Sequence, residues 1–336
     1  MHVAQIVESL RASRGFGHKR DIAGVLSALG NALPGGVGDL GQAVAVGDDC
    51  AVIADQDGYL LFAIEGMVSD FIRAKPWFAG YSAVMVNVSD VYAMGGRPLA
   101  VVDAIWSQGV GDAAEVLRGM AAASAAYGVP IVGGHSNARS DHGQLAVAIV
   151  GRAGSLLSSF AARPGDRLLM AVDLRGAFAE PYPYWNASTE APAGRLRADL
   201  ELLPALAEEG LCAAAKDISM AGTLGTALML LECSGVGARI DLQRVPAPAG
   251  VPLQRWLTAF PSYGFLLAVR EPDVERVSAR FRARDIACAQ IGIIDDSRQV
   301  SVSGAGESAL LWDFARDAFI VPQAGAPARG TTPADA

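Results

Sequence analysis

Cysteine and histidine are scarce in this sequence, and neither forms a metal-binding pattern. The 336 residues include four of each. The cysteines are Cys50, Cys212, Cys233 and Cys288, which lie far apart and form no Cys-x-x-Cys motif. Zinc-binding and dithiol redox motifs are therefore absent, and free thiols in a reducing compartment are expected. No two histidines have the spacing of a metal-binding pair.

Long apolar runs and clusters of basic residues are also missing. No stretch of about 18 uninterrupted apolar residues occurs, so no membrane span is expected. The first ten residues contain Glu8 and lack the features of a secretory signal, which predicts a cytoplasmic protein. The net charge is −8, and no group of Lys and Arg offers the positive surface that nucleic acids require. This charge is compatible with a nucleotide whose phosphates bind through Mg²⁺.

The hydrophobic pattern predicts an α+β chain, with mixed α/β character, of about two domains. A turn at residues 163–166 is followed by a new strand, which places the domains at residues 1–155 and 156–320. Residues 321–336 are rich in Pro, Gly, Ala and Thr and are expected to form a disordered tail.

Apolar periodicity and Gly or Pro stops locate the individual elements. The expected helices are 3–13, 21–29, 80–94, 112–127, 193–209, 222–233, 272–282 and 308–319. The expected strands are 43–46, 51–54, 59–64, 99–105, 130–132, 145–150, 167–172, 238–241, 264–269 and 287–294. Two glycines around Phe16 predict a mobile loop over residues 15–19, and residues 31–41 and 133–137 also read as loops.

Common phosphate-binding and hydrolase motifs are absent or poorly matched. The sequence contains no P-loop motif. Residues 36–41 fit Gly-x-Gly-x-x-Gly, but they follow Pro34-Gly35 rather than a strand, and Asp39 would fill the space that a phosphate needs. The segment is interpreted as a flexible loop. His135 has no supporting Ser/His/Asp context, so nucleophilic hydrolysis is not favoured.

Carboxylates with apolar neighbours are the clearest candidates for chemistry. They are Asp48, Asp49, Glu65, Asp90 and Asp217. Each also has a structural explanation when taken alone, such as a turn for Asp48, a helix surface for Asp90 or a helix cap for Asp217. Buried carboxylates are costly unless they are paired or metal-bound, and oxygen ligands on separate segments suit Mg²⁺ with nucleotide phosphates.

Five motifs then occur in a fixed order. They are Gly-Asp-Asp-Cys-Ala-Val at 47–52, Asn-Val-Ser-Asp-Val-Tyr-Ala-Met-Gly-Gly-Arg-Pro at 87–98, Gly-Gly-His-Ser at 133–136, Lys-Asp-Ile-Ser at 216–219 and Ser-Gly-Val-Gly-Ala-Arg-Ile-Asp at 234–241. Together they resemble the AIR synthase-like superfamily, which includes AIR synthase, thiamine-monophosphate kinase, selenophosphate synthetase and a carbamoyl-dehydrating hydrogenase maturation protein. The resemblance covers residues 15–294.

This resemblance implies a two-domain AIR synthase-like fold whose N-terminal strands pair into a homodimer with a shared barrel. It also implies ATP between the domains, with its phosphates on Mg²⁺. Carried over by position, the implied metal ligands are Asp48, Asp49, Asp90 and Asp217, with Glu65 in place of a strand aspartate. The implied ATP-binding residues are Asn87, Gly133, Gly134, His135, Ser136 and Asn137.

The N-terminal Gly-x-Gly-x-Lys segment resembles the lid of selenophosphate synthetase with one decisive departure. Phe16 stands where that family has a cysteine or selenocysteine, so selenium chemistry is not expected. Lys19 is retained, and we expect its ammonium group to act in catalysis by reaching the ATP phosphates.

Thiamine-monophosphate kinase is matched in part. His135 departs from its Gly-Gly-Asp-Thr-Thr motif, Met220 replaces an aspartate, and residues 260–264 lack the acidic residues of its Gly-Glu-Asp-Tyr-Glu motif. The carbamoyl-dehydrating family has an acceptor cysteine at its C-terminus, whereas this sequence ends in Pro-Ala-Asp-Ala. That activity is therefore not expected.

The sequence thus predicts an ATP-dependent, Mg²⁺-requiring enzyme of an AIR synthase-related branch, which phosphorylates or activates an oxygen of a small metabolite. Thiamine-monophosphate kinase and a non-catalytic nucleotide-binding protein remain alternatives. The expected partners are a small-molecule substrate and a second copy of the chain, with no nucleic acid or membrane. The acceptor site is guessed to lie near Trp77, Trp106 or Trp185.

Overall fold

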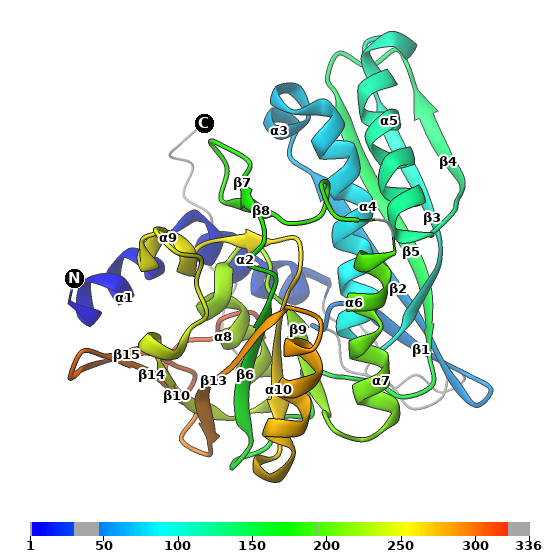
Figure 1. Cartoon of the computed structure of the whole chain (residues 1–336). Coiled ribbons are helices and arrows are strands. Elements are labelled where there is room, and N and C mark those ends of the chain that lie inside the picture. Colours follow the sequence, from blue (N-terminus) through cyan, green and yellow to red (C-terminus); the bar gives the residue numbers. More distant parts are fainter. Residues whose placement is uncertain (1, 30–46, 193, 322–336) are drawn as a thin grey trace.

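The first lobe of the computed structural model is a five-stranded sheet with long helices on one face (Figure 1). The structure describes residues 2–29, 47–192 and 194–321. The strands, in sheet order, are β1 (Ala51–Asp55), β2 (Gly58–Met67), β5 (Gln144–Ala153), β3 (Arg97–Trp106) and β4 (Ile131–Asn137). The helices are α3 (Ser69–Ala74), α4 (Pro76–Ala93) and α5 (Val110–Tyr127). Helix α4 packs on the sheet, and α5 packs on α4.

Helix α4 is enclosed on all sides. Every residue from Ala79 to Ala93 is buried, as expected for a helix that is apolar around its whole circumference. Glycines let it approach α5 closely, because a Cβ atom on Gly80 would lie 2.0 Å from the carbonyl oxygen of Val116. This packing carries the polar side chains of α4, including Asp90, into the interior.

The second lobe is built on a seven-stranded mixed sheet. Its order is β15 (Glu307–Asp313), β14 (Gln299–Gly304), β10 (Gly237–Asp241), β13 (Ala287–Asp295), β6 (Arg167–Val172), β12 (Gly264–Val269) and β9 (Ala214–Asp217). A small third sheet contains β11 (Phe260–Pro261), β8 (Tyr184–Asn186) and β7 (Ala177–Phe178). The helices are α1 (Val3–Arg11), α2 (Arg14–Leu29), α6 (Arg195–Leu200), α7 (Leu202–Glu208), α8 (Gly222–Ser234), α9 (Leu253–Leu257) and α10 (Val274–Arg282), with 3₁₀ turns η2 (Leu242–Arg244) and η3 (Glu271–Asp273).

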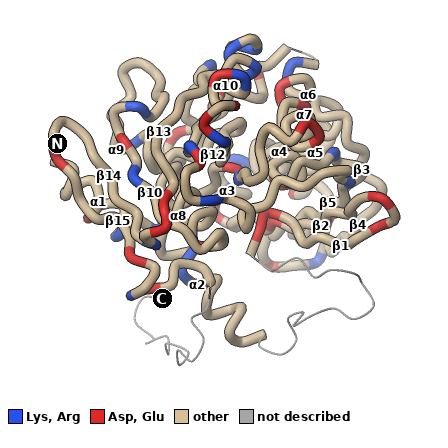
Figure 2. The backbone as a smooth tube through the Cα atoms, turned by 90° about the horizontal axis from the view of Figure 1, so that it is seen from below, with Lys and Arg blue, Asp and Glu red and all other residues tan. Residues whose placement is uncertain are grey.

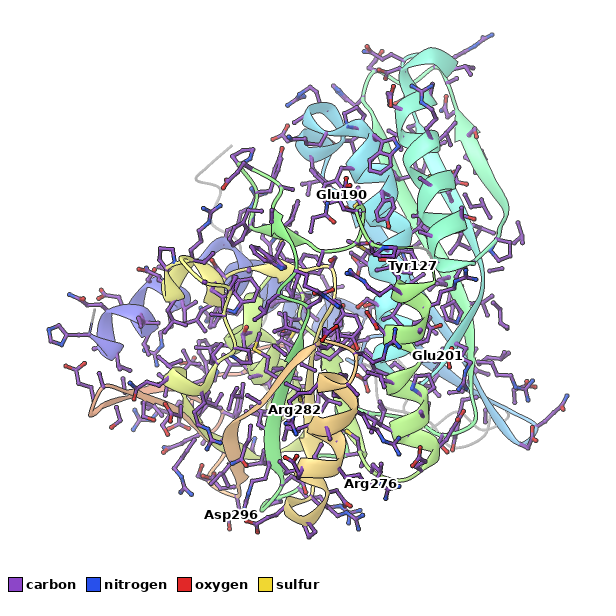
Figure 3. All side chains as sticks on the ribbon, in the orientation of Figure 1. Tyr127, Glu190, Glu201, Arg276, Arg282 and Asp296 are labelled. Carbon is purple, nitrogen blue, oxygen red and sulfur yellow. The ribbon has the colours of Figure 1, made fainter. Side chains whose placement is uncertain are left out.

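The two lobes share a hydrophobic core and several polar contacts. The hydroxyl of Ser188 lies 2.6 Å from that of Tyr81 and 2.7 Å from that of Tyr127. Arg97 pairs with Glu201 at 2.9 Å and with Glu208 at 2.6 Å. In Figure 3, Tyr127 and Glu201 lie along the boundary where α5, α6 and α7 meet. These contacts fix the lobes against each other.

The mixed two-domain α/β architecture predicted from the sequence is confirmed, while the domain limits at 155 and 156 stay a prediction. The expected helix over residues 308–319 is wrong. Residues 307–313 form strand β15, which pairs with β14 in an antiparallel ladder. Leu311 and Trp312 are both buried, and the register of the ladder shifts opposite them, between Val300 and Ser301.

The loop expected at residues 15–19 is also wrong, because these residues lie inside helix α2. Phe16 is fully buried and packs edge-to-face on Phe319, with ring centroids 5.3 Å apart. Gly15 serves close packing rather than mobility, since a Cβ atom there would lie 2.4 Å from the carbonyl oxygen of Met220. Phe16 therefore anchors α2 on the second lobe and fixes the position of Lys19.

Residues 133–137, expected to form a loop, belong to strand β4 at the edge of the five-stranded sheet. The predicted loop at 31–41, the strand at 43–46 and residues 322–336 of the predicted tail lie outside the described residues. The four cysteines are free thiols, as expected. Among the described helices, none is long and apolar enough to cross a membrane. Acidic and basic residues are interspersed over both lobes in Figure 2.

Candidate metal and nucleotide site

Three carboxylates converge where the lobes meet. Asp49 precedes β1, Asp90 lies on α4, and Asp217 ends β9. One carboxylate oxygen from each lies within 4.8 Å of the others. Oxygen ligands gathered from three separate segments are typical of sites for hard divalent cations such as Mg²⁺.

Burial and mutual repulsion make the ionised forms of these carboxylates unfavourable. Desolvation raises the pKa of Asp90 well above its ordinary value, and the charges of Asp217 and Glu65 raise it further. Desolvation also raises the pKa of Asp217, against the lowering effect of Lys216. For Asp49, desolvation raises the pKa to about 7 although Lys216 opposes it. A bound cation would relieve this repulsion.

Unsatisfied oxygens show that this group fits a metal ion. Oδ2 of Asp49 and Oδ2 of Asp90 are buried and have no hydrogen-bond partner among the described residues. Buried polar atoms are normally paired, and a divalent cation would satisfy these two carboxylate oxygens. Asp49, Asp90 and Asp217 would therefore hold Mg²⁺.

Lys216 is a buried cation within the same site, and the sequence analysis assigned it no role. Its ammonium group forms a short ion pair with Oδ1 of Asp49 and lies 4.0 Å from Oδ1 of Asp48. Burial alone would lower the pKa of Lys216, but the nearby aspartates raise it above its ordinary value. The available signal was one lysine after a run of three alanines, directly before a candidate ligand.

Asp48 has different surroundings from the three converging carboxylates. Its two side-chain oxygens accept hydrogen bonds from the hydroxyl of Ser158 at 3.0 Å, the backbone of Ser159 at 2.8 Å and the hydroxyl of Ser159 at 2.6 Å. Asp48 is outside the group of possible metal ligands in the described chain. These bonds hold the turn that presents Asp49, and the role of Asp48 as a metal ligand stays a prediction.

Two adjoining cavities open beside the carboxylates. One, of about 220 Å³, extends among aromatic side chains, and the other, of about 260 Å³, extends past Asp48, Asp49 and Lys216. The walls that they share come from both lobes and are formed by Lys19, Ile22, Glu65, Asp90, Asp217 and Ser219. The hydroxyl of Ser219 has no partner among the described residues.

Glu65 and Lys19 stand at this shared wall. Glu65 lies inside β2 rather than at its end and remains accessible to the cavities. The surrounding protein still desolvates it and raises its pKa, although the charge of Lys19 acts in the opposite direction. Lys19 therefore lies near enough to the acidic group to influence it, as a residue that contacts phosphates should.

The predicted ATP-binding residues lie elsewhere in this chain. Asn87 is fully buried, and its Nδ2 donates to the carbonyl oxygens of Ala83 at 2.8 Å and Val147 at 3.0 Å, which ties α4 to β5. Residues 133–137 are exposed on β4 and line neither cavity. The structure thus places Lys19, Glu65 and the aspartates around the two cavities. Asn87 and residues 133–137 lie outside the walls of these cavities.

The chain belongs to the family of AIR synthase related proteins. The N-terminal domain of that family matches residues 47–153, and its C-terminal domain matches residues 178–304. An uncharacterised protein of Synechocystis sp. is 47% identical over 93% of this chain and 96% of its own length. An uncharacterised protein of Methanocaldococcus jannaschii is 32% identical over 82% of this chain and 86% of its own.

Solved structures share the fold. PurL of T. maritima, solved with ADP, superposes with a TM-score of 0.68 at 20% identity over 83% of this chain. The chain spans about half of that protein, covering 47% of it. A ThiL protein solved with AMPPCP and TMP gives a TM-score of 0.59 at 21% identity, over 78% of this chain and 89% of its own. These likenesses confirm the AIR synthase-like architecture.

Proposed function

We propose that this chain is an ATP-dependent, Mg²⁺-requiring enzyme that phosphorylates or otherwise activates an oxygen of a small metabolite. The observation that carries the proposal is the convergence of Asp49, Asp90 and Asp217 beside cavities that Lys19 also lines. Structural neighbours support it, since T. maritima PurL has been solved with ADP and with ATP, and ThiL with AMPPCP.

Each group has a distinct role in the proposed reaction. When bound to the aspartates, Mg²⁺ would neutralise the charge of the triphosphate. Lys19 adds a positive charge at the wall that both cavities share. The acceptor oxygen forms a bond to the γ-phosphorus while the bond from that phosphorus to the β,γ-bridging oxygen breaks, and ADP leaves with the electron pair. If the acceptor is a hydroxyl, Glu65 takes its proton, because a raised pKa makes this carboxylate a stronger base.

Thiamine-monophosphate kinase is the second candidate. The aromatic walls of the smaller cavity, including Phe71 and Tyr184, would suit a flat heteroaromatic acceptor. The structural likeness to a ThiL protein solved with TMP agrees with this possibility. Met220, which stands in place of the kinase's aspartate, also lines that cavity and makes it less polar.

Release of ADP from Mg²⁺–ATP across a panel of small metabolites, including thiamine monophosphate, tests both candidates. We expect ADP to form only when an acceptor and a divalent cation are both present. Thiamine monophosphate that yields no thiamine diphosphate at high enzyme concentration ends the second candidate. ATP binding without ADP formation for any acceptor would instead establish a non-catalytic nucleotide-binding protein.

The bare face of the five-stranded sheet supports a homodimer. Phe62 and Ile64 alternate with buried residues of β2, so they point away from α4, and they are 50% and 64% exposed. Val102 lies on the same face, because it and Ile64 both pair with Ala148. An apolar patch of this kind marks an interaction surface. We expect sedimentation to give about twice the chain mass of 34.8 kDa, and a monomer at micromolar concentration would contradict the dimer.

The dimer matters for the predicted role of residues 133–137 in nucleotide binding. In one chain, β4 lies three strands away from β2, about 14 Å across the sheet. Its Gly133, His135 and Asn137 follow the bare face rather than the cavities. In the proposed dimer, a nucleotide contact from this segment would be made to a site of the second copy.

A further inference from the structure

The smaller cavity continues from the shared carboxylates into a chamber walled by aromatic side chains. Phe71 of α3 and Phe78 of α4 come from the first lobe, and Tyr184 of β8 and Phe260 of β11 come from the second. We call these four residues the aromatic chamber. The small third sheet, formed by β7, β8 and β11, holds the two aromatic residues of the second lobe in place.

The rings of the aromatic chamber brace one another. Phe71 packs edge-to-face on Tyr184 at 4.9 Å and on Phe78 at 5.9 Å between ring centroids. Tyr184 meets Phe260 at 6.1 Å and stacks on Tyr182 at 5.2 Å. Walls that are already packed in this way lose little side-chain entropy when a ligand enters. The chamber is therefore preorganised for a ligand rather than filled by its own side chains.

The cavity offers little for a phosphate or carboxylate on the distal part of a ligand. Among the described residues that line it, none is arginine, and the basic ones are Lys19 and His18. Lys19 is at the wall shared with the second cavity, where the proposed nucleotide phosphates need it. The remaining polar groups include hydroxyls of Ser82, Ser219 and Ser262, which suit single hydrogen bonds to a neutral ligand.

The charged end and the volume of the cavity further restrict the class of ligand that it can bind. Glu65, Asp90 and Asp217 close one end of the cavity, where the proposed Mg²⁺ would lie, and no arginine elsewhere in its described lining could hold an anionic ring body. Aromatic walls bind flat rings through stacking and edge-to-face contacts, and they also tolerate a positive charge. A volume of about 220 Å³ admits a small ring system with a short arm.

We infer that the acceptor is a small molecule with a flat, neutral or cationic ring that carries no phosphate on the ring, bound in the aromatic chamber. Its oxygen-bearing arm points toward Asp90 and Asp217. This inference rests on the proposed function, because it names the substrate class of that same site. It separates this chain from enzymes whose acceptor is a sugar phosphate, which arginine or lysine side chains must hold.

Saturation-transfer NMR on the full chain tests the chamber without turnover. The probe is 2-phenylethanol, which has a flat ring and a hydroxyl-bearing arm, and the competitor is ribose 5-phosphate. We expect 2-phenylethanol to bind the wild-type protein and the control Tyr184→Phe, which keeps the ring. Tyr184→Ala should bind it about tenfold more weakly, because the aromatic contact is lost. Displacement of 2-phenylethanol by ribose 5-phosphate, or equal binding by all three proteins, would overturn the inference.

Binding of fluorescently labelled ATP to the same proteins distinguishes a failure of this inference from a failure of the proposed function. Tyr184→Ala should bind the nucleotide as the wild type does, because Tyr184 lines only the smaller cavity. If no sample binds the nucleotide while 2-phenylethanol still depends on the ring of Tyr184, the proposed function fails and the chamber remains a ring-binding site. Circular dichroism checks folding, and Phe260→Ser against Phe260→Tyr gives the same comparison if Tyr184→Ala unfolds.

Discussion

Replacement of Asp90 by asparagine is expected to reduce ADP formation by about 10²- to 10³-fold. Asp90 is 7% exposed and lies on the enclosed helix α4, and its Oδ2 has no partner among the described residues. Asparagine keeps the shape but removes the charge that would hold Mg²⁺. A coupled assay for ADP, with Mg²⁺ varied over several orders of magnitude, measures the loss in turnover and in metal affinity.

The same substitution should stabilise the metal-free protein. The pKa of Asp90 is raised in the folded state, so ionisation at neutral pH opposes folding, and an uncharged residue removes that cost. We therefore expect a higher midpoint of urea unfolding for Asp90→Asn in EDTA, together with a smaller stabilisation when Mg²⁺ is added. A residue with a purely structural role would not show gain of stability and loss of function together.

Asp57→Asn is the matched control, because Asp57 is 93% exposed and pairs only with Arg152 among the described residues. It should keep the turnover of the wild type. Unchanged turnover in Asp90→Asn would remove Asp90 from the metal site, and a lower unfolding midpoint in EDTA would contradict the electrostatic explanation.

Lys216→Met should destabilise the metal-free protein by about 3–5 kcal/mol. The side chains of Lys216 and Asp49 are 5% and 7% exposed, so the ion pair is screened little by water. Methionine removes the cation that lowers the pKa of Asp49, so this buried carboxyl must take up a proton or remain charged without a counter-ion. Urea unfolding in EDTA at neutral pH measures the free energy of unfolding, and an unchanged m-value shows that the unfolded state is comparable.

Lys19→Met provides the comparison, because it removes a lysine from the accessible wall of the cavities and should cost far less stability. Addition of Asp49→Asn to Lys216→Met should recover much of the lost stability, since neither partner is then charged. If Lys216→Met unfolds at the same urea concentration as the wild type, the buried pair contributes nothing and the assignment fails.

Residues that lie in strongly patterned segments could be predicted from the sequence. Asp90 stands in a predicted long apolar helix, and Asp217 follows a run of apolar residues, so a need for a partner was apparent for both, but strand β9 was not predicted. The convergence of these residues could not be derived from spacing, because α4 and β9 belong to different lobes. The ordered motifs supplied it through the family resemblance.

Tertiary contacts decided what the sequence left open. Gly15 and Gly17 predict a loop from local preference, yet the closeness of Met220 and the burial of Phe16 make the segment helical. The sequence did not predict the aromatic chamber, because its residues come from four elements with no common spacing. Trp185, one of the guessed tryptophans, lines the same cavity. Of the guessed tryptophans, Trp77 stacks on Tyr81, and Trp106 of β3 lies beside His135 of β4; neither lines either of the two cavities beside the carboxylates.

The division of the carboxylates between the lobes has a mechanical consequence. Asp49 and Asp90 belong to the lobe of the five-stranded sheet, whereas Asp217 belongs to the lobe of the seven-stranded sheet. A cation coordinated by all three would link the two lobes. Any motion that separates the two sheets would then have to break a bond to the metal. Lys19, which Phe16 fastens to the second lobe, would travel with Asp217 in such a motion. Release of the product and release of the cation are then expected to be coupled events.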